Sequence, residues 1–176
     1  MRQRGFTSFE MAIVMFVTAV LAVFGLPSLK ATQASNRIWG DARSIAAELT
    51  LAKMRAASAF SRSRLSFNAA SGTYQVETLD RTAGAYRTEG ATQRLSSGVS
   101  FGYGGIATAA GSQASIQQSS PITFNSRSLP VDGGGALTTN NAVYLNNGSA
   151  YYAVTVSISG RVVVWRYGGT AWQAAR

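Results

Sequence analysis

The hydrophobic positions in the first third of the chain follow two patterns. Residues 11–29 form a run of 19 positions without a charge, close to the ~20 apolar residues that cross a bilayer core as a helix. After this run, apolar residues recur at alternating steps of four and three, which places them on one face of an amphipathic helix: Ile38, Ala42, Ile45, Leu49, Ala52 and Ala56. We therefore predict a long helix in two parts, residues 6–29 and 30–60.

From residue 61 onward, apolar and polar positions alternate in the way that is typical of β-strands. Arg64–Phe67 and Thr73–Glu77 predict a hairpin with a five-residue loop. Because an amphipathic helix cannot bury its own apolar stripe, we expect residues 30–60 to pack on a sheet formed by this part of the chain.

The last third of the chain gives the clearest β signal. Residues 152–159 and 161–167 flank Gly160 and predict a hairpin with a tight turn. Ile122–Phe124 is predicted as a short strand that Pro121 opens.

The middle of the chain predicts little regular structure. Residues 95–103 alternate weakly and are a candidate strand. Residues 80–93 are polar and contain two glycines, so we expect a surface loop there, and we assign no structure to residues 104–120. Glycine and asparagine clusters predict turns at residues 132–135, 140–141 and 146–148.

Glu10 is an acid at the edge of the apolar run. An ionised carboxylate in a membrane span costs about 2–3 kcal/mol or more unless it finds a partner. A cut after Gly5 makes Phe6 the N-terminus, and its amine then lies four residues before Glu10 on the same helical face. That amine, or the amine of a neighbouring copy, can neutralise the carboxylate. Arg2 and Arg4 keep the leading end on the cytoplasmic side.

The sequence Gly5-Phe6-Thr7-Ser8-Phe9-Glu10, behind a short basic leader, resembles the class III signal of type IV pilins and pseudopilins. The resemblance implies that a prepilin peptidase cuts after Gly5 and methylates the amine of Phe6. It also implies that Glu10 and Thr7 act in filament assembly. Ser8-Phe9 stand where the family usually has two aliphatic residues.

Pro27 resembles a proline found at this place in many pilins, and we count it among the assembly residues. It removes the helical hydrogen bond to the carbonyl of Val23, so we predict a bend or local melting there. Two other readings of the N-terminal region compete with the pilin signal. A secretory signal peptide has a shorter apolar core, and a plain single-pass anchor leaves Glu10 unexplained.

The composition argues against an enzyme. The chain has no cysteine and no histidine, which excludes thiol nucleophiles, thiolate or imidazole metal sites and histidine-based triads. The seven acids include no pair at a catalytic spacing, and we expect no cofactor. Asp132 lies among glycines and is a weak candidate for calcium, because one acid is little for a hard cation.

The C-terminal half carries a second resemblance. Ile122-Thr123-Phe124-Asn125, and a valine-rich strand that runs into Ser159-Gly160-Arg161-Val162, are similar to the head domain of the GspH/FimT group of minor pseudopilins. This implies an α+β fold, with a long N-terminal helix, membrane-spanning in its first half, packed on an antiparallel β-sandwich or barrel-like head. Ser128 and Leu129 stand where that group often has a glycine.

The two resemblances together predict four segments: a leader (1–5), a transmembrane and assembly helix (6–29), an amphipathic helix (30–60) and a β-rich periplasmic head (61–176). We expect Tyr151, Tyr152 and Val162–Val164 to serve the core and the sheet rather than a ligand site.

The chain is strongly basic, with a net charge of +9. Loss of residues 1–5 leaves 14 basic and 7 acidic side chains, a balance of +7. Such an excess favours anionic partners, namely nucleic acid, lipid headgroups or an acidic protein, or it serves solubility alone.

A candidate phosphate-binding patch includes Arg161. In DNA-binding members of the resembled group a Gly-Arg-x-Arg turn grips nucleic acid, and here Val163 takes the last place. The patch would consist of Arg161, Arg166, Arg127 and Arg176, with Trp165, Tyr167 or Trp172 available for stacking. The alternative is a solvated arginine on a hairpin beside core aromatics.

The sequence thus predicts a minor pseudopilin, a structural subunit of a type II secretion pseudopilus or a type IV pilus. The resemblance implies storage as a single-pass protein of the bacterial inner membrane, with the head in the periplasm. Implied partners are other pilins or pseudopilins, the prepilin peptidase, the inner-membrane assembly platform and membrane lipid. The alternatives are a FimT-like minor pilin that binds DNA for uptake, and a major pilin.

Overall fold

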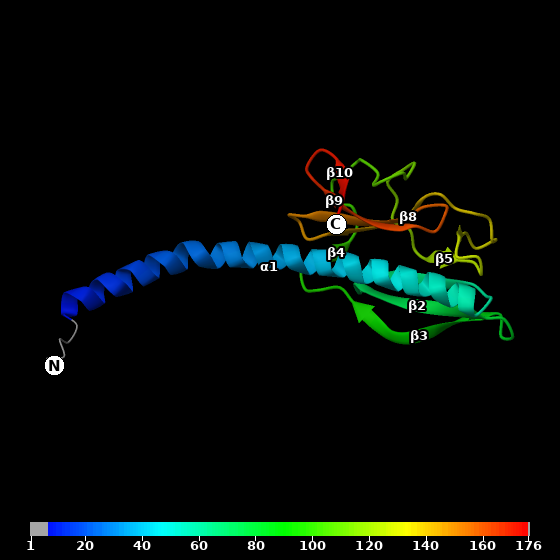
Figure 1. Cartoon of the computed structure of the whole chain (residues 1–176), viewed down its shortest axis with the longest axis horizontal. Helices are drawn as coiled ribbons and strands as arrows, with labels where there is room; N and C mark the ends of the chain where they lie inside the picture. The colour runs from blue at the N-terminus through cyan, green and yellow to red at the C-terminus, as the bar shows by residue number, and fades with distance from the viewer. Residues whose placement is uncertain (1–6, 176) are drawn as a thin grey trace. The chain divides into compact units, whose positions relative to one another are not determined.

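The computed structural model describes residues 7–175, with the backbone alone for residues 22 and 24–28. The chain divides into two compact units, Met1–Asn36 and Arg37–Arg176. One helix, α1 (Ser8–Ser58), contributes to both units. All ten strands belong to the second unit (Figure 1), which we call the head.

The backbone of α1 is helical through Gly25 and Pro27, so the predicted local melting does not occur there. Within residues 7–175, no helix combines the length and the hydropathy that a membrane crossing requires. The membrane span over residues 6–29 therefore stays a prediction.

The head contains two antiparallel sheets of five strands each. The first sheet has the order β3-β2-β1-β5-β6. Its strands are β1 (Ser63–Asn68), β2 (Thr73–Asp80), β3 (Ala85–Arg94), β5 (Ile122–Phe124) and β6 (Pro130–Val131). The predicted first hairpin is confirmed, because β1 pairs with β2 from Ser63↔Thr78 to Asn68↔Thr73.

The second sheet has the order β10-β9-β8-β7-β4. Its strands are β4 (Ser100–Phe101), β7 (Asn141–Asn146), β8 (Tyr151–Val156), β9 (Val162–Tyr167) and β10 (Trp172–Ala174). The predicted C-terminal hairpin is confirmed as β8 and β9. Within residues 7–175 the strands form two separate sheets and no closed barrel, so the predicted antiparallel head is confirmed and its barrel-like form is not.

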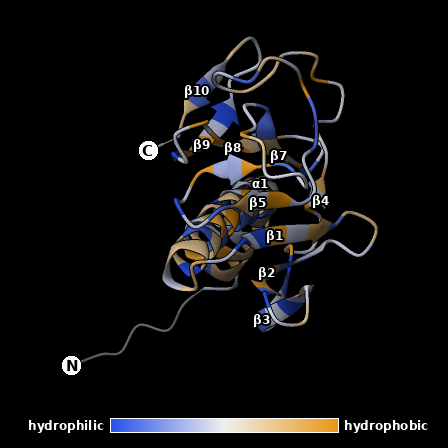
Figure 2. Cartoon of the chain, turned by 90° about the vertical axis from the view of Figure 1, so that its right-hand side faces the viewer, coloured by the Kyte–Doolittle hydropathy of each residue, from blue (hydrophilic) through white to orange (hydrophobic). Residues whose placement is uncertain are grey.

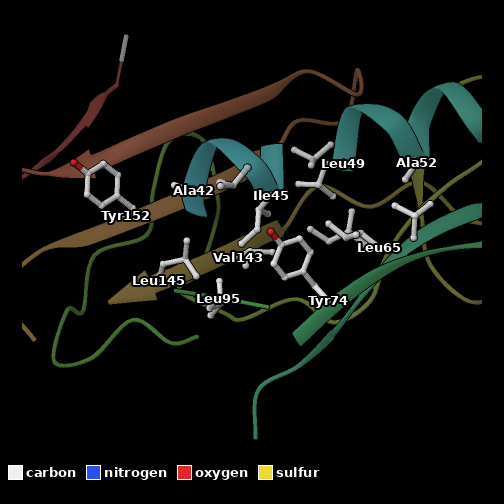
Figure 3. Close-up of a cluster of buried hydrophobic side chains, with 14 of the residues drawn as sticks. Ala42, Ile45, Leu49, Ala52, Leu65, Tyr74, Leu95, Val143, Leu145 and Tyr152 are labelled. Carbon is white, nitrogen blue, oxygen red and sulfur yellow. The ribbon is translucent and has the colours of Figure 1, made fainter. Parts of the chain in front are cut away.

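The part of α1 within the head lies between the two sheets (Figures 1 and 2) and supplies the centre of the core. All six residues of the predicted apolar stripe have exposed fractions of 0%. Figure 3 shows four of them, Ala42, Ile45, Leu49 and Ala52, gathered with Leu65 and Tyr74 of the first sheet and with Val143 and Leu145 of the second. The sequence prediction that this stripe packs on a sheet is confirmed, and the stripe packs on two.

Four strands, β3, β6, β7 and β10, were not predicted from the sequence. The polar stretch 80–93 was expected to be a loop, but most of it forms β2's end and the edge strand β3. Polar side chains on both faces of an uncovered edge strand hide its period of two. Strand β7 was also missed, because its side chains are buried on both faces and show no alternation. Strand β10 has only three residues, too few for a pattern.

Smaller differences concern the middle of the chain. The candidate strand at 95–103 shrinks to β4, two residues long. Asn141 begins β7 instead of lying in a turn. Residues 104–120, to which the sequence assigned no structure, contain no helix or strand and partly cover the outer side of the second sheet through Ala110 and Ile116.

The four edges of the two sheets differ greatly in length. Strands β4 and β6 have two residues each and β10 has three, whereas β3 has ten, most of them exposed. Strand β3 carries charges that are paired within the head: Arg87 with Asp80 (2.9 Å) and Glu89 with Arg55 of α1 (3.0 Å). Its pairing with β2 is irregular between Tyr74 and Val76.

Candidate functional site

Thr7 and Glu10 cap the start of α1 by forming hydrogen bonds to each other. The backbone N–H of Thr7 donates to Glu10 Oε2 (2.8 Å), and the Thr7 hydroxyl donates to the same oxygen (2.9 Å). The backbone N–H of Glu10 donates in turn to the Thr7 hydroxyl (3.2 Å). This is a capping box, which gives partners to N–H groups that a helix start leaves unpaired.

The capping box gives the Glu10 carboxylate hydrogen-bond partners, although not a positive charge. Its carboxylate is directed back to the first turn and accepts hydrogen bonds one residue away from Phe6 in the sequence. Sequence analysis identified Glu10 and Thr7 but did not foresee that they bond to each other. The Ser/Thr-x-x-Glu spacing of Thr7 and Glu10 was the available signal. The predicted processing residues, Gly5 and Phe6, lie outside the described residues.

Between this cap and Leu29, the large apolar side chains of α1 that the structure describes are exposed. Phe9 is 74% exposed, Phe16 71% and Leu21 67%. The other large apolar residues described around them have exposed fractions from 39% to 68%: Met11, Ile13, Val14, Met15, Val17, Val20, Val23 and Leu29. A continuous apolar surface of this kind marks a site of contact with lipid or with another protein.

A second candidate region is the turn between β8 and β9, where Gly160 meets two other elements. The ammonium of Lys53 on α1 donates to the Gly160 carbonyl (3.0 Å). The Gly160 backbone has a φ of 76°, and a Cβ placed there would lie 2.3 Å from the Ser128 carbonyl oxygen. Only glycine fits this contact, so the turn is fixed against both α1 and the 125–129 loop.

Ser128 takes a left-handed conformation, with a φ of 64°. The resembled group often has a glycine in this loop, and here a serine adopts the backbone that glycine would favour. Asn125 supports it, because its side-chain oxygen accepts from the N–H groups of Arg127 (2.9 Å) and Leu129 (3.1 Å). The loop is an Asx-type turn that compensates for the unfavourable conformation.

The structure brings together only part of the predicted arginine patch. Arg127 and Arg161 are both exposed and stand beside the contact between Ser128 and Gly160. Arg166 lies at the other end of β9, five residues and roughly 16 Å along the strand from Arg161. Arg176 lies outside the described residues. Neither Arg127 nor Arg161 has an ion-pair partner within residues 7–175.

The aromatic residues proposed for stacking are engaged in packing. Trp165 donates its ring N–H to the Thr155 hydroxyl (2.8 Å), and Trp172 donates to the Thr108 carbonyl (2.8 Å). Tyr167 contacts Trp172, with ring centroids 5.2 Å apart. Among the described residues, no group of acids is placed to hold a metal ion, and Asp132 accepts the backbone N–H of Ala136 within its turn.

Sequence reasoning missed one polar groove on the outer side of the first sheet. Its volume is about 720 Å³, and Arg62, Arg64 and Tyr86 lie along it. The spacing of Arg62 and Arg64 puts both side chains on one face of the strand, but an alternation of arginine and serine at 61–64 gave no reason to single them out.

No protein-family model matches the chain, and no curated protein matches it in sequence. Among solved structures, it is similar to the minor pseudopilin EpsH from the type 2 secretion system of Vibrio cholerae, with 12% identity and a TM-score of 0.53. The match covers 75% of this chain and 98% of that chain. A crystal structure of EpsH from the same organism aligns with 14% identity and a TM-score of 0.48, covering 80% and 98%. The chain therefore has the fold of a minor pseudopilin, an α+β fold with a long helix and antiparallel sheets.

Proposed function

We propose that this protein is a minor pseudopilin, a subunit that enters a filament of a type II secretion system or a type IV pilus. In this proposal a prepilin peptidase removes residues 1–5, and the apolar helix stays in the inner membrane until assembly. The helix then moves from lipid into a bundle of like helices on the assembly platform. The work of the protein is assembly, and the proposal includes no catalysis.

The observation that carries the proposal is the exposed apolar surface of α1 behind the Thr7–Glu10 cap. This surface needs an apolar partner, and the acid at its start needs a positive one. A bundle of processed copies provides both, because each copy supplies apolar side chains and a free amine. The fold likeness to EpsH supports the same role.

The test is Glu10→Ala in the full chain, followed by measurement of its content in isolated filaments. Hydrogen bonds to charged groups contribute about 1.5–3 kcal/mol, so we expect incorporation to fall about 10- to 100-fold. Glu48→Ala removes an acid further along the same helix and should leave incorporation unchanged. Normal incorporation of the Glu10→Ala variant would refute the pairing between the acid and the amine.

Sequencing the mature chain from its N-terminus tests processing independently. The proposal requires Phe6 as the first residue, in methylated form. A mature chain that begins at Met1, or that begins after Leu29, contradicts it.

A second candidate function is DNA binding during uptake. Arg127 and Arg161 favour it, because they flank the contact between Ser128 and Gly160 and form no ion pair within residues 7–175. Binding of the full chain in detergent to a DNA duplex should weaken with salt and with Arg161→Gln. Arg166→Gln, at the far end of β9, is the matched control and should have little effect. No binding at low salt would remove this candidate.

A further inference from the structure

The groove on the outer side of the first sheet holds two arginines that are fixed by the protein but keep donors free. Arg64 forms an ion pair through Nε with Glu77, and its guanidinium carbon lies 3.8 Å from the centre of the Tyr86 ring. These two contacts fix the plane of the guanidinium. Its two terminal nitrogens have no partner within residues 7–175.

Arg62 also lines the groove and is held in a similar way. Its Nη1 donates to the Gly133 carbonyl (3.0 Å), and its Nη2 packs so closely on Gly135 that a Cβ there would lie 2.6 Å from it. Arg62 has no ion-pair partner among the described residues. Both guanidinium groups are therefore oriented before any ligand arrives, which lowers the entropy cost of binding.

The remainder of the groove wall is made of amide and hydroxyl groups. They come from the 117–121 segment, from β5, from the loop before β7 and from β7, and they include Gln117, Ser119, Thr123, Thr138 and Asn141. Ser119, Thr138 and Asn141 already form hydrogen bonds within the head. The side chains of Gln117 and Thr123 remain to bond to the N–H and C=O groups of an extended peptide. A carboxylate on that peptide matches the free edge of a guanidinium, which presents two parallel N–H donors.

The charges in and beside the groove limit what fits. Asp132 lines the groove and Glu77 is bonded to Arg64, so the two acids nearly balance the two arginines. A polyanion such as nucleic acid gains little from a balanced surface. A sugar chain favours an open aromatic face, and Arg64 covers one face of Tyr86. A single carboxylate on an otherwise neutral chain fits both conditions.

We propose that this groove binds an extended segment of another protein that carries one aspartate or glutamate between neutral polar residues. The carboxylate lies between Arg62 and Arg64, and the backbone of the segment follows the amide and hydroxyl wall. This surface is separate from the apolar helix, so the proposal does not depend on the filament role and can fail without affecting it.

The test uses the full chain in detergent micelles and two blocked octapeptides of glycine and serine. One peptide has a central glutamate, and its twin has glutamine at that position. Titration followed by NMR chemical shifts should give an affinity for the glutamate peptide at least about tenfold higher than for the glutamine peptide. The shifted resonances should include the side chains of Arg62 and Arg64.

Two variants identify the groove as the site. Arg62→Gln removes one cation, and Arg64→Lys keeps the charge while it removes the two parallel donors. Each should abolish the preference for glutamate, whereas Arg127→Gln, an exposed arginine outside the groove, should retain it. Because Arg64→Lys preserves a partner for Glu77, it also controls for loss of folding.

Several results would overturn the proposal. Equal affinity for the two peptides excludes recognition of a carboxylate. An equal loss in the Arg127→Gln variant shows that net charge alone attracts the peptide. Saturable binding of an oligonucleotide or an acidic polysaccharide, without binding of the glutamate peptide, assigns the groove to another class of ligand.

Discussion

Residues 8–36 and residues 37–58 belong to one helix, yet their apolar side chains meet opposite conditions. In the first stretch the large apolar residues whose side chains are described are exposed, with Leu21 at 67%. In the second, Leu49 has no exposed surface and packs between two sheets. A helix that is apolar all round needs a partner outside its own chain, whereas a helix with one apolar stripe completes itself against its own chain.

The largest effect should come from one substitution made in each stretch. Leu49→Ala leaves a cavity in the core and should lower the free energy of unfolding of the head by about 2–5 kcal/mol. Leu21→Ala makes the same chemical change at an exposed site and should alter it by less than about 0.5 kcal/mol. Denaturant unfolding of the full chain in detergent, followed by tryptophan fluorescence, measures both. Equal effects would show that the two stretches do not differ in this way.

A somewhat smaller effect should follow Gly160→Ala, which disturbs the turn that Lys53 ties to the buried stretch of α1. The new Cβ meets the Ser128 carbonyl at 2.3 Å and the φ is positive, so we expect a loss of about 2–4 kcal/mol. Gly148→Ala has a similar φ of 81° but no atom within 4 Å of the new Cβ, and should cost only about 1–2 kcal/mol. If the two variants unfold at the same denaturant concentration, the contact with Ser128 contributes nothing.

The smallest effect concerns pH and Tyr74, which packs against the buried stretch of α1. Burial, followed by the charges of Asp41 and Glu48, raises the pKa of Tyr74 to about 12. The unfolded chain then loses this proton near pH 10, before the folded chain does, so stability falls as pH rises from about 10 to 12. After allowance for solvent screening, we expect a loss of about 1–2 kcal/mol.

Urea unfolding at pH 9 and pH 11.5 measures this loss, and Tyr74→Phe is its control. The variant should show a smaller fall in stability over the same interval. An unchanged fall in Tyr74→Phe would assign the effect to other groups, among them Tyr144, whose pKa burial also raises.

Much of the head could be predicted because its patterns are local. The stripe from Ile38 to Ala56 and the two hairpins follow from periodicity and turn residues alone. Strand β3 could not be found this way, since an uncovered edge strand has polar residues on both faces. Strand β7 could not either, because α1 covers one of its faces and Tyr144 is buried on the other.

The contacts of the candidate sites also divide into local ones, which the sequence can predict, and long-range ones, which it cannot. Thr7 and Glu10 are three residues apart, so a sequence motif can identify them. The contact between Lys53 and Gly160 joins residues 107 positions apart, and the Arg62 contact with Gly133 spans 71. Pairings at such separations depend on which strands become neighbours, and no spacing in the sequence records that.

The unequal edges of the sheets matter in the proposed filament, which would hold many heads close together. The edge strands β4, β6 and β10 are so short that they offer almost no free backbone to a neighbouring sheet. On the long edge strand β3, charged side chains and an irregular register with β2 hinder pairing with a neighbouring sheet. Neighbouring heads can therefore lie close together without pairing into extended β-aggregates. Substitutions that neutralise Arg87 or Glu89 would weaken this protection first.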